Sequence, residues 1–347
     1  MIQIDGRMGE GGGQVLRTAL AMSLVTQTPI EITHIRAKRP SPGLKPQHVA
    51  AVKAAALVGG DADVEGGEPG SMELSFKPRG TFTGAFRFDV GTAGSTMLVL
   101  QTVLPALIIA KETSQIVLEG GTHNPLAPTF GFVERAYLPL IAKLGAKVTM
   151  KLERPGFYPA GGGKVRVQVE PAKGAKIAKL SLLERGDLKK RRGYAAVVEL
   201  PAHIIERELK VLKLALGFKP LELRAAELGP GRSPGNVVHI EFESENVTEV
   251  ITAIGAKNIR AEQVAENAAA EAKRYLDSGV PVGPYLADQL LVLLAIGAGG
   301  TYRTMEPTPH TNTQIDLLKS AFGVDASVVK DGKTWVVSVA KRRVASL

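Results

Sequence analysis

The sequence predicts an α/β fold, in the α+β sense, made of three similar units, the third of which carries an inserted smaller α/β domain. Three observations lead to this prediction. The order helix, strand, loop, helix, strand occurs three times along the chain. A glycine follows the second helix of each unit, at Gly60, Gly145 and Gly323. These glycines lie 85 and 178 residues apart, so the third unit contains 93 additional residues.

Hydrophobic periodicity defines the elements of each unit. The first unit contains a helix, a strand, a second helix and a second strand at Gln14–Leu24, Ile30–Ile35, Val49–Leu57 and Ala62–Val64. In the second unit they lie at Ser95–Ala110, Gln115–Glu119, Phe132–Leu144 and Ala146–Val148. In the third they lie at Tyr285–Ile296, Tyr302–Met305, Ile315–Phe322 and Ala326–Val328. Glycine ends such helices because it adopts the left-handed conformation at little cost. The competing interpretation is a chance spacing of common glycines.

The additional residues match a segment with a character of its own. We expect an inserted domain at 184–278 and a main domain made of 1–183 and 279–347. Within the insertion the pattern predicts strands at Tyr194–Leu200, Leu221–Ala226 and Val237–Phe242, and helices at Ile204–Leu216 and Val247–Gly255. A further helix, Ala261–Leu276, belongs either to the insertion or to the third unit.

Composition narrows the class of protein. The 347 residues include 43 Lys and Arg against 34 Asp and Glu, a net charge of +9, which suits a polyanionic partner but also an ordinary soluble protein. The absence of cysteine excludes disulfides, thiolate nucleophiles and Cys-ligated zinc. The longest apolar stretch, Met97–Ala110, is too short to span a bilayer, and Met1–Gly6 does not resemble a signal peptide. We therefore expect a cytoplasmic protein without a membrane partner.

A glycine-rich run precedes the first helix, from Gly9 to Gly13, and is followed by Gln14-Val15-Leu16-Arg17. Glycines here allow either a tight turn or a close approach of backbone N–H groups to a phosphate. The run is not a dinucleotide fingerprint, because Gln14 stands where that pattern requires glycine. Glu10 offers a hard oxygen ligand for a magnesium ion, and Arg17 lies one turn into the helix.

A basic loop follows the first predicted strand of the first unit. It contains Arg36, Lys38, Arg39 and Lys45 and ends in Gln47-His48. Arginine guanidinium groups on a short loop suit bidentate recognition of a terminal phosphate. A solvated charged loop is the alternative interpretation.

His310 lies in the corresponding loop of the third unit, within Glu306-Pro307-Thr308-Pro309-His310. His48 and His123 are found near the equivalent position of the first and second units. An imidazole that faces a basic loop can attack phosphorus as a nucleophile as well as transfer protons. Asp288 interrupts an apolar helix, where it could cap buried backbone, orient His310 or bind a ribose.

These motifs together resemble RNA 3′-terminal phosphate cyclases of the catalytically competent branch. The resemblance covers Asp5 to Phe322. It rests on five segments: Gly9 to Arg17, Ile35-Arg36-Ala37, Pro42-Gly43-Leu44 with Gln47-His48, Phe157 to Gly163, and Tyr285-Leu286-Ala287-Asp288-Gln289. One departure is Gln314, where the family often has asparagine four residues after the histidine.

The resemblance implies three repeats that each pair two helices with a four-stranded sheet. It also implies ATP-dependent conversion of an RNA 3′-phosphate end to a 2′,3′-cyclic phosphate, through a covalent histidyl-AMP on His310 and an RNA(3′)pp(5′)A intermediate. Glu10 would hold a divalent metal, Mg²⁺ or Mn²⁺. The phosphate and RNA end would meet Arg17, Arg36, Arg39, Gln47 and His48. ATP, the co-substrate, would lie near Gln101, Pro128, Tyr285, Leu286, Ala287, Asp288 and Gln289.

Other functions remain open at this point. A catalytically inactive cyclase-like scaffold in ribosomal RNA processing, an enolpyruvyl transferase-like enzyme, and adenylylation of 5′-phosphate ends all fit parts of the pattern. The presence of His310 argues against the inactive scaffold. Labelling with ATP would distinguish an enolpyruvyl transferase from a cyclase, because the transferase needs no adenylylation. The sequence leaves undecided the physiological RNA, whether the chain forms a homo-oligomer, and the role of the inserted domain.

Overall fold

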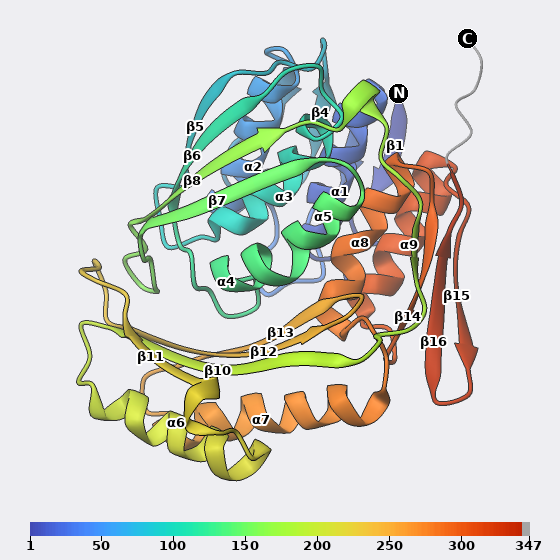
Figure 1. Cartoon of the computed structure of the whole chain (residues 1–347). Helices are drawn as coiled ribbons and strands as arrows, with labels where there is room; N and C mark the ends of the chain where they lie inside the picture. The colour runs from blue at the N-terminus through green and yellow to red at the C-terminus, as the bar shows by residue number, and fades with distance from the viewer. Residues whose placement is uncertain (342–347) are drawn as a thin grey trace.

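The computed structural model describes residues 1–341 and contains four small mixed sheets of four strands each (Figure 1). Residues 342–347 of the predicted main domain lie outside the described residues. The expected mixed α/β class is confirmed. No helix in the described chain is both long and apolar enough to cross a bilayer.

The first sheet has the strand order β1 (Ile2–Asp5), β2 (Ile30–Thr33), β4 (Leu74–Lys77), β3 (Asp63–Glu65). Its helices are α1 (Gly13–Thr26) and α2 (Pro46–Val58). The β1–β2 pair is parallel because α1 returns the chain across the sheet, and the remaining pairs are antiparallel.

The second sheet repeats this arrangement with β5 (Ala85–Asp89), β6 (Ser114–Gly120), β8 (Gly163–Glu170) and β7 (Lys147–Arg154). Its first helix is α3 (Thr96–Leu107). Its second is continuous but irregular, from α4 (Phe130–Phe132) through the π-helical η1 (Val133–Tyr137) to α5 (Leu138–Lys143). Again the first strand pair is parallel and the others are antiparallel.

The third sheet has the order β9 (Leu180–Leu182), β14 (Gly300–Thr304), β16 (Thr334–Val339), β15 (Ala326–Asp331), with helices α8 (Pro284–Ile296) and α9 (Pro309–Phe322). Strands β9 and β14 pair in parallel although more than a hundred residues separate them in sequence. The 3₁₀ turn η2 (Lys173–Ala175) precedes β9. The three sheets therefore share one strand order and one pattern of strand directions.

The segment between β9 and α8 forms the fourth sheet, in the order β11 (Leu223–Glu227), β10 (Leu188–Val198), β12 (Gly235–Ser244), β13 (Thr248–Ile254). The 3₁₀ turn η3 (Pro220–Glu222) leads into β11. Helices α6 (His203–Leu216) and α7 (Ala261–Ser278) cover one face of this sheet (Figure 1). Val264, Ala268 and Tyr275 of α7 belong to the apolar core beneath it, so α7 packs with the fourth sheet.

The prediction of a helix at Val247–Gly255 is wrong, because this stretch is strand β13. Five of the seven residues of β13 are Val, Ile or Thr. Branched side chains lose rotamer freedom in a helix and fit well on a pleated sheet. Pairing with β12 along the whole strand then satisfies the backbone.

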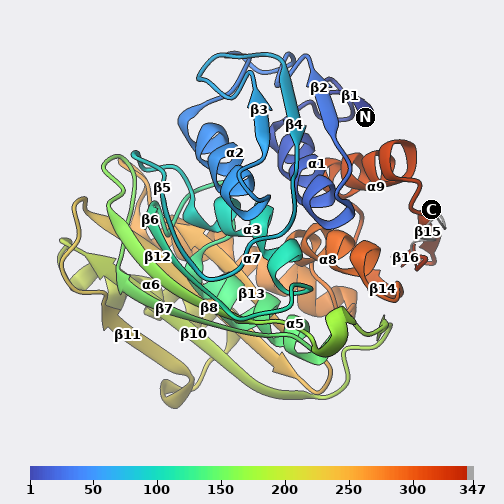
Figure 2. The ribbon, with the colours of Figure 1, turned by 90° about the horizontal axis from the view of Figure 1, so that it is seen from above.

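The helices of the three similar sheets gather in the middle of the molecule, and the sheets lie outside them (Figure 2). One apolar cluster runs through all three, which makes a common core. The free face of the fourth sheet lies against α4 and η1 (Figure 1). There Thr129 Oγ1 lies 3.1 Å from His239 Nε2, and Arg135 pairs with Glu241 at 3.3 Å.

Candidate active site

The first turns of α1 and α9 meet at one place and bring the glycine run to His310. Helix α9 begins here because Thr308 is its N-cap, accepting a hydrogen bond from Thr311 N at 3.2 Å, and Pro309 suits the first helical position. His310 follows immediately, with a side chain that is 46% exposed. Helix α1 begins at Gly13, after the N-cap Gly12.

The imidazole of His310 is held on one side only. Its Nδ1 lies 2.9 Å from Oε1 of Gln14, in hydrogen-bond geometry, and 3.0 Å from Oε1 of Glu10. The acceptor oxygen of Gln14 and the nearby carboxylate of Glu10 assign the proton to that nitrogen. Nε2 is then left with its lone pair, which is the form that a nucleophile requires.

Glu10 lies between the guanidinium group of Arg39 and the imidazole of His310. Its Oε2 is 3.0 Å from Nη2 of Arg39, while its buried Oε1 faces Nδ1 of His310 at 3.0 Å without a well-formed hydrogen bond from any described residue. A Cβ on Gly12 would lie 2.3 Å from that Oε1, so glycine makes room for the carboxylate. The glycine run therefore accommodates side chains of the site.

The pKa of His310 is below its ordinary value. Partial burial lowers the pKa, the carboxylate of Glu10 raises it, and Arg17 and Arg39 lower it further. The imidazole is consequently neutral at neutral pH, in agreement with the role of a nucleophile.

His48 occupies the first turn of α2 and lies against the same glycine run. Its Nδ1 accepts a hydrogen bond from Lys45 N at 3.0 Å, so the proton is on Nε2. A Cβ on Gly13 would lie 2.3 Å from this Nε2. Burial, followed by the charges of Arg17, Arg36 and Lys45, lowers the pKa of His48 to about 3. His48 is therefore a neutral donor.

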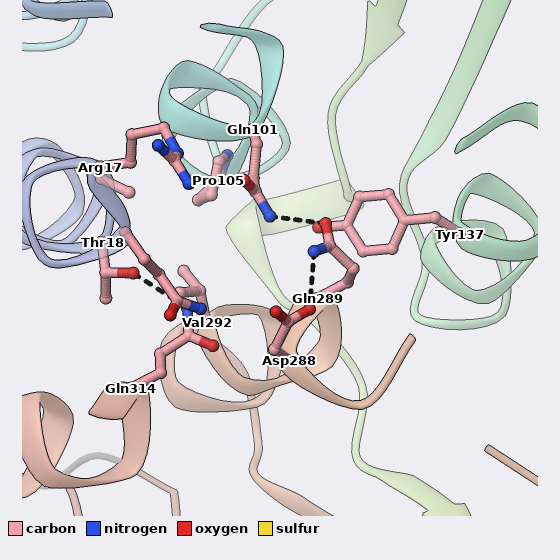
Figure 3. A pocket seen from close by; sticks show the side chains of 11 residues that line it. Arg17, Thr18, Gln101, Pro105, Tyr137, Asp288, Gln289, Val292 and Gln314 are labelled. Carbon is pink, nitrogen blue, oxygen red and sulfur yellow. Dashed lines mark hydrogen bonds between the residues drawn. The ribbon is translucent and has the colours of Figure 1, made fainter. Parts of the chain in front are cut away.

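Arg17 projects from α1 into a cavity that it shares with Gln101 of α3 and Asp288 of α8 (Figure 3). Its Nε is buried and has no hydrogen-bond partner among residues 1–341. Burial lowers the pKa of Arg17 to about 10, so the group is still charged at neutral pH. A buried guanidinium with unused donors is a site for an anion.

Three polar side chains form a chain across this cavity (Figure 3). Gln101 Nε2 donates to Gln289 Oε1 at 2.5 Å, and Gln289 Nε2 donates to Asp288 Oδ1 at 2.7 Å. Burial raises the pKa of Asp288 to about 7, although Gln289 and Arg17 lower it. Gln314 reaches the same cavity and donates to Thr18 Oγ1 at 2.9 Å.

A larger cavity of about 300 Å³ opens beside this one and reaches His310. It contains most of the residues that the resemblance assigned to ATP. Its lining comprises Gln14, Arg17, Leu98, Gln101, Asn124, Pro125, Leu126, Ala127, Pro128, Thr129, Phe132, Val250, Thr252, Ile254, Tyr285, Asp288, Gln289 and His310. The side chains of Leu286 and Ala287 are instead fully buried in the apolar core.

Of the remaining residues predicted for the phosphate end, Arg36 and Arg39 lie on the loop after β2, and Gln47 lies in the first turn of α2. Nη1 of Arg36 donates to the carbonyls of Ser41 and Gly43, each at 2.7 Å, so part of its guanidinium shapes its own loop. Gln47 Oε1 accepts a hydrogen bond from Ser95 N at 3.4 Å. Neither lines the larger cavity.

Sequence reasoning missed several residues of the site. Gln14 lies within the glycine motif, one turn before Arg17, and this spacing was an available signal. Leu126 is fully exposed at the cavity with φ of 60°, and nothing in the sequence indicated it. The sequence did not indicate Val250, Thr252 and Ile254 as cavity residues, because a helix was predicted where strand β13 lies.

The other histidines do not join the site. His123 is buried, with its ring stacked on Phe157 at 4.8 Å, and burial lowers its pKa to about 4. His239 is buried against Thr129. His34 and His203 are exposed at the end of β2 and the start of α6.

Within residues 1–341 no group of three or more His, Asp or Glu side chains is arranged to hold a metal ion. Glu10 fits a different kind of site. Magnesium is often bound by one or two carboxylates and completed by substrate phosphates and water. The carboxylate of Glu10, whose buried Oε1 accepts no hydrogen bond within residues 1–341 although His310 lies 3.0 Å away, is suited to that role.

Comparisons with known proteins show what this chain is similar to. The family model described as RNA 3′-terminal phosphate cyclase matches residues 8–328. A protein named RNA 3′-terminal phosphate cyclase from Koribacter versatilis is 43% identical over 342 residues, covering 99% of this chain and 96% of that protein. One of the same name from Ralstonia nicotianae is 44% identical over 338 residues, covering 97% and 96%. Among solved structures, the enolpyruvyl transferase NikO from Streptomyces tendae aligns with a TM-score of 0.39 and 10% identity, over 95% of this chain and 47% of that one.

Proposed function

Because the chain belongs to the RNA 3′-terminal phosphate cyclase family, we propose that it converts RNA 3′-phosphate ends to 2′,3′-cyclic phosphates at the expense of ATP. The observation that carries the proposal is the arrangement of His310. Nδ1 faces the oxygens of Gln14 and Glu10, and Nε2 is left free as a nucleophile beside the larger cavity.

In the first step Nε2 of His310 attacks the α-phosphorus of ATP. A P–N bond forms, the bond to the β-phosphate oxygen breaks, and pyrophosphate leaves. The imidazole ring, now bonded at Nε2 and protonated at Nδ1, carries a positive charge. Glu10 at 3.0 Å stabilises that charge, which lowers the barrier electrostatically.

Glu10 would also hold a divalent metal, Mg²⁺ or Mn²⁺, as the carboxylate ligand from the protein. When bound, the metal supplies charge neutralisation for the triphosphate. Arg39 at 3.0 Å keeps the Glu10 side chain in place before substrate arrives.

In the second step a 3′-phosphate oxygen of RNA attacks the phosphorus of the histidyl-AMP, and the P–N bond breaks. Two anions must approach each other, and Arg17, Arg36, Arg39, Gln47 and His48 would offset their repulsion. The partly desolvated guanidinium of Arg17 supports this assignment.

In the third step the adjacent 2′-OH attacks the 3′-phosphorus, the cyclic ester forms, and AMP leaves while the hydroxyl proton passes to solvent. The attack is intramolecular, and proximity supplies roughly 7 kcal/mol or more of the barrier lowering. The protein then needs mainly to hold the end of the RNA in place.

The adenosine would occupy the larger cavity. Tyr285 is 59% exposed at the first turn of α8, where its ring can stack on adenine. Gln101, Pro128, Asp288 and Gln289 line the rest of this cavity and would surround the nucleoside. Leu286 and Ala287 would contribute through the backbone and through core packing.

We also infer that the three sheets of common topology are repeats of one unit, and that 184–278 is a domain inserted into the third. The main domain would then comprise 1–183 and 279–347. The separate core beneath β10 to β13 supports this division. We place the reaction in the cytoplasm, where RNA ends and ATP occur together.

The experiment that tests this proposal traps the covalent intermediate. Wild-type protein is incubated with ATP labelled at the α-phosphate, and the attachment site is mapped by mass spectrometry. We expect AMP on His310 through a bond that is labile in acid and resistant to alkali. His310→Ala should form no adduct while keeping its circular dichroism spectrum. A normal adduct yield in His310→Ala would contradict the mechanism, and an enolpyruvyl transferase would show no adduct in either protein.

A further inference from the structure

One wall of the larger cavity comes from the inserted sheet. Val250, Thr252 and Ile254 alternate along β13, so their side chains point to the same face and line the cavity. Tyr285 and Asp288 of α8 also line this cavity. The width of the cavity therefore depends on how β13 is placed relative to the start of α8.

Glu249 lies where these two elements meet. It is 3% exposed and comes directly before Val250. Its Oε2 accepts a hydrogen bond from Gly283 N at 2.6 Å, and its Oε1 accepts one from Val250 N at 3.2 Å. One carboxyl group thus joins the backbone of the cavity wall to the N-cap residue of α8.

Local geometry is adapted to this contact. Gly283 is the N-cap of α8 and offers no side-chain oxygen of its own, so an acidic group from elsewhere can stabilise the helix terminus. A Cβ at Gly283 would lie 2.7 Å from Glu249 Oε2. The glycine is needed for the carboxyl group to come so close.

The position of Glu249 is costly for the fold. Burial raises its pKa to about 8 even though both backbone N–H groups lower it, and Glu271 raises it further. An apolar side chain there would avoid this desolvation. In return, Glu249 accepts hydrogen bonds from two specific backbone N–H groups, which an apolar side chain could not do.

We infer that Glu249 of the inserted domain is a positioning residue for the nucleotide cavity, which it sets by fixing the start of α8 against β13. This gives the inserted domain a function in ATP binding. The inference rests on the proposed use of the larger cavity for ATP. Glu249 itself touches no cavity surface and acts through Tyr285 and the β13 wall.

The test compares Glu249→Gln with a matched control, Glu208→Gln. Glutamine keeps the volume of Glu249 but turns an NH₂ group toward one of the two N–H donors. Glu208 is also a fully buried acid of the inserted domain, and burial raises its pKa to about 7. Its partner is Asn236, at 2.8 Å, and it does not line the larger cavity.

We expect Glu249→Gln to raise KM for ATP in histidine adenylylation by roughly five- to tenfold, the effect of a lost helix cap, with the rate at saturation nearly unchanged. Glu208→Gln should keep the wild-type KM even where its melting temperature falls. An unchanged KM in Glu249→Gln, with only a lower melting temperature, would overturn the inference and leave Glu249 a structural residue.

A second variant approaches the same contact from the other side. Gly283→Ala places a methyl group against the Glu249 carboxyl, so it should reproduce the KM increase, and the double variant should be no worse than either single one. Additive effects would contradict a shared contact. This variant also serves if Glu249→Gln does not fold.

Hydrogen exchange separates this inference from the proposed function. Amides of Tyr285 to Gln289 should exchange faster in Glu249→Gln than in wild type, and not in Glu208→Gln. This result does not depend on activity. A protein without any ATP adduct would disprove the proposed function, whereas unchanged exchange in α8 would disprove the role of Glu249.

Discussion

Gln14 accepts a hydrogen bond from His310 across 296 residues of sequence, with Oε1 and Nδ1 2.9 Å apart. The contact joins the first turn of α1 to the first turn of α9. It fixes which ring nitrogen of His310 carries the proton. The glutamine of the glycine motif therefore decides whether Nε2 can act as a nucleophile.

Gln14→Leu should slow histidine adenylylation by roughly 10- to 100-fold, as happens when the partner that orients a functional imidazole is removed. The rate is measured by single-turnover formation of the AMP adduct at saturating ATP. Gln314→Leu is the matched control, because Gln314 also joins α9 to α1, through Thr18 Oγ1, whereas the side-chain hydrogen bond of His310 goes to Gln14. Equal rate losses in the two variants would show that only helix packing matters.

Arg17→Lys should lower kcat/KM for the RNA 3′-phosphate by roughly 10- to 100-fold, the loss of one charge-assisted phosphate contact. Lysine keeps the charge but cannot present the planar fork, and it leaves no donor where the buried Nε lies. The exposed Arg7, which pairs with Asp5 on the surface, provides the control Arg7→Lys. Wild-type kinetics in Arg17→Lys would mean that the site recognises the phosphate through the charge at position 17 alone, and not through the guanidinium geometry.

A DNA strand ending in a 3′-phosphate should accept AMP from His310 and then stop, because ring closure needs a 2′-OH. The activated DNA–AMP end should accumulate, while a matched RNA end should proceed to the cyclic phosphate. Gel analysis of labelled products separates the two. A single terminal ribonucleotide on the DNA strand should restore cyclisation. If it does not, attack by the 2′-OH loses its support.

His123→Phe should reduce the acid sensitivity of the fold. The folded pKa of His123 is about 4, below its unfolded value, so the unfolded chain binds the proton first as the pH falls. Stability is therefore present above pH 6.5 and is lost toward pH 4, by up to about 3 kcal/mol at 1.36 kcal/mol per pKa unit.

Urea unfolding at pH 7 and pH 4.5 measures this difference in wild type and variant. Phenylalanine can keep the stacking on Phe157, and Thr122 Oγ1 still accepts a hydrogen bond from Gly156 N at 2.9 Å. A pH dependence in the variant as steep as in the wild type would assign the effect to other buried groups, of which His239 is the nearest candidate.

The sequence by itself determined the mixed α/β class, the recurring order of helices and strands, and the family, because local periodicity, glycine stops and short motifs are properties of neighbouring residues. It also pointed to His310, Arg17 and Glu10. Helix propensity and apolar spacing could not distinguish β13 from a helix, because a short apolar run fits the helical period as well as the strand period. The pairing with β12 decides between the two.

Only the tertiary structure decided which groups share the site. Gln14 and His310 come from opposite ends of the chain, and Glu249 meets Gly283 because the fourth sheet packs at the start of α8. Burial that lowers the pKa of His48 and raises that of Asp288 likewise arises from tertiary packing. Contacts of this kind depend on distances between residues remote in sequence, and no local pattern specifies them.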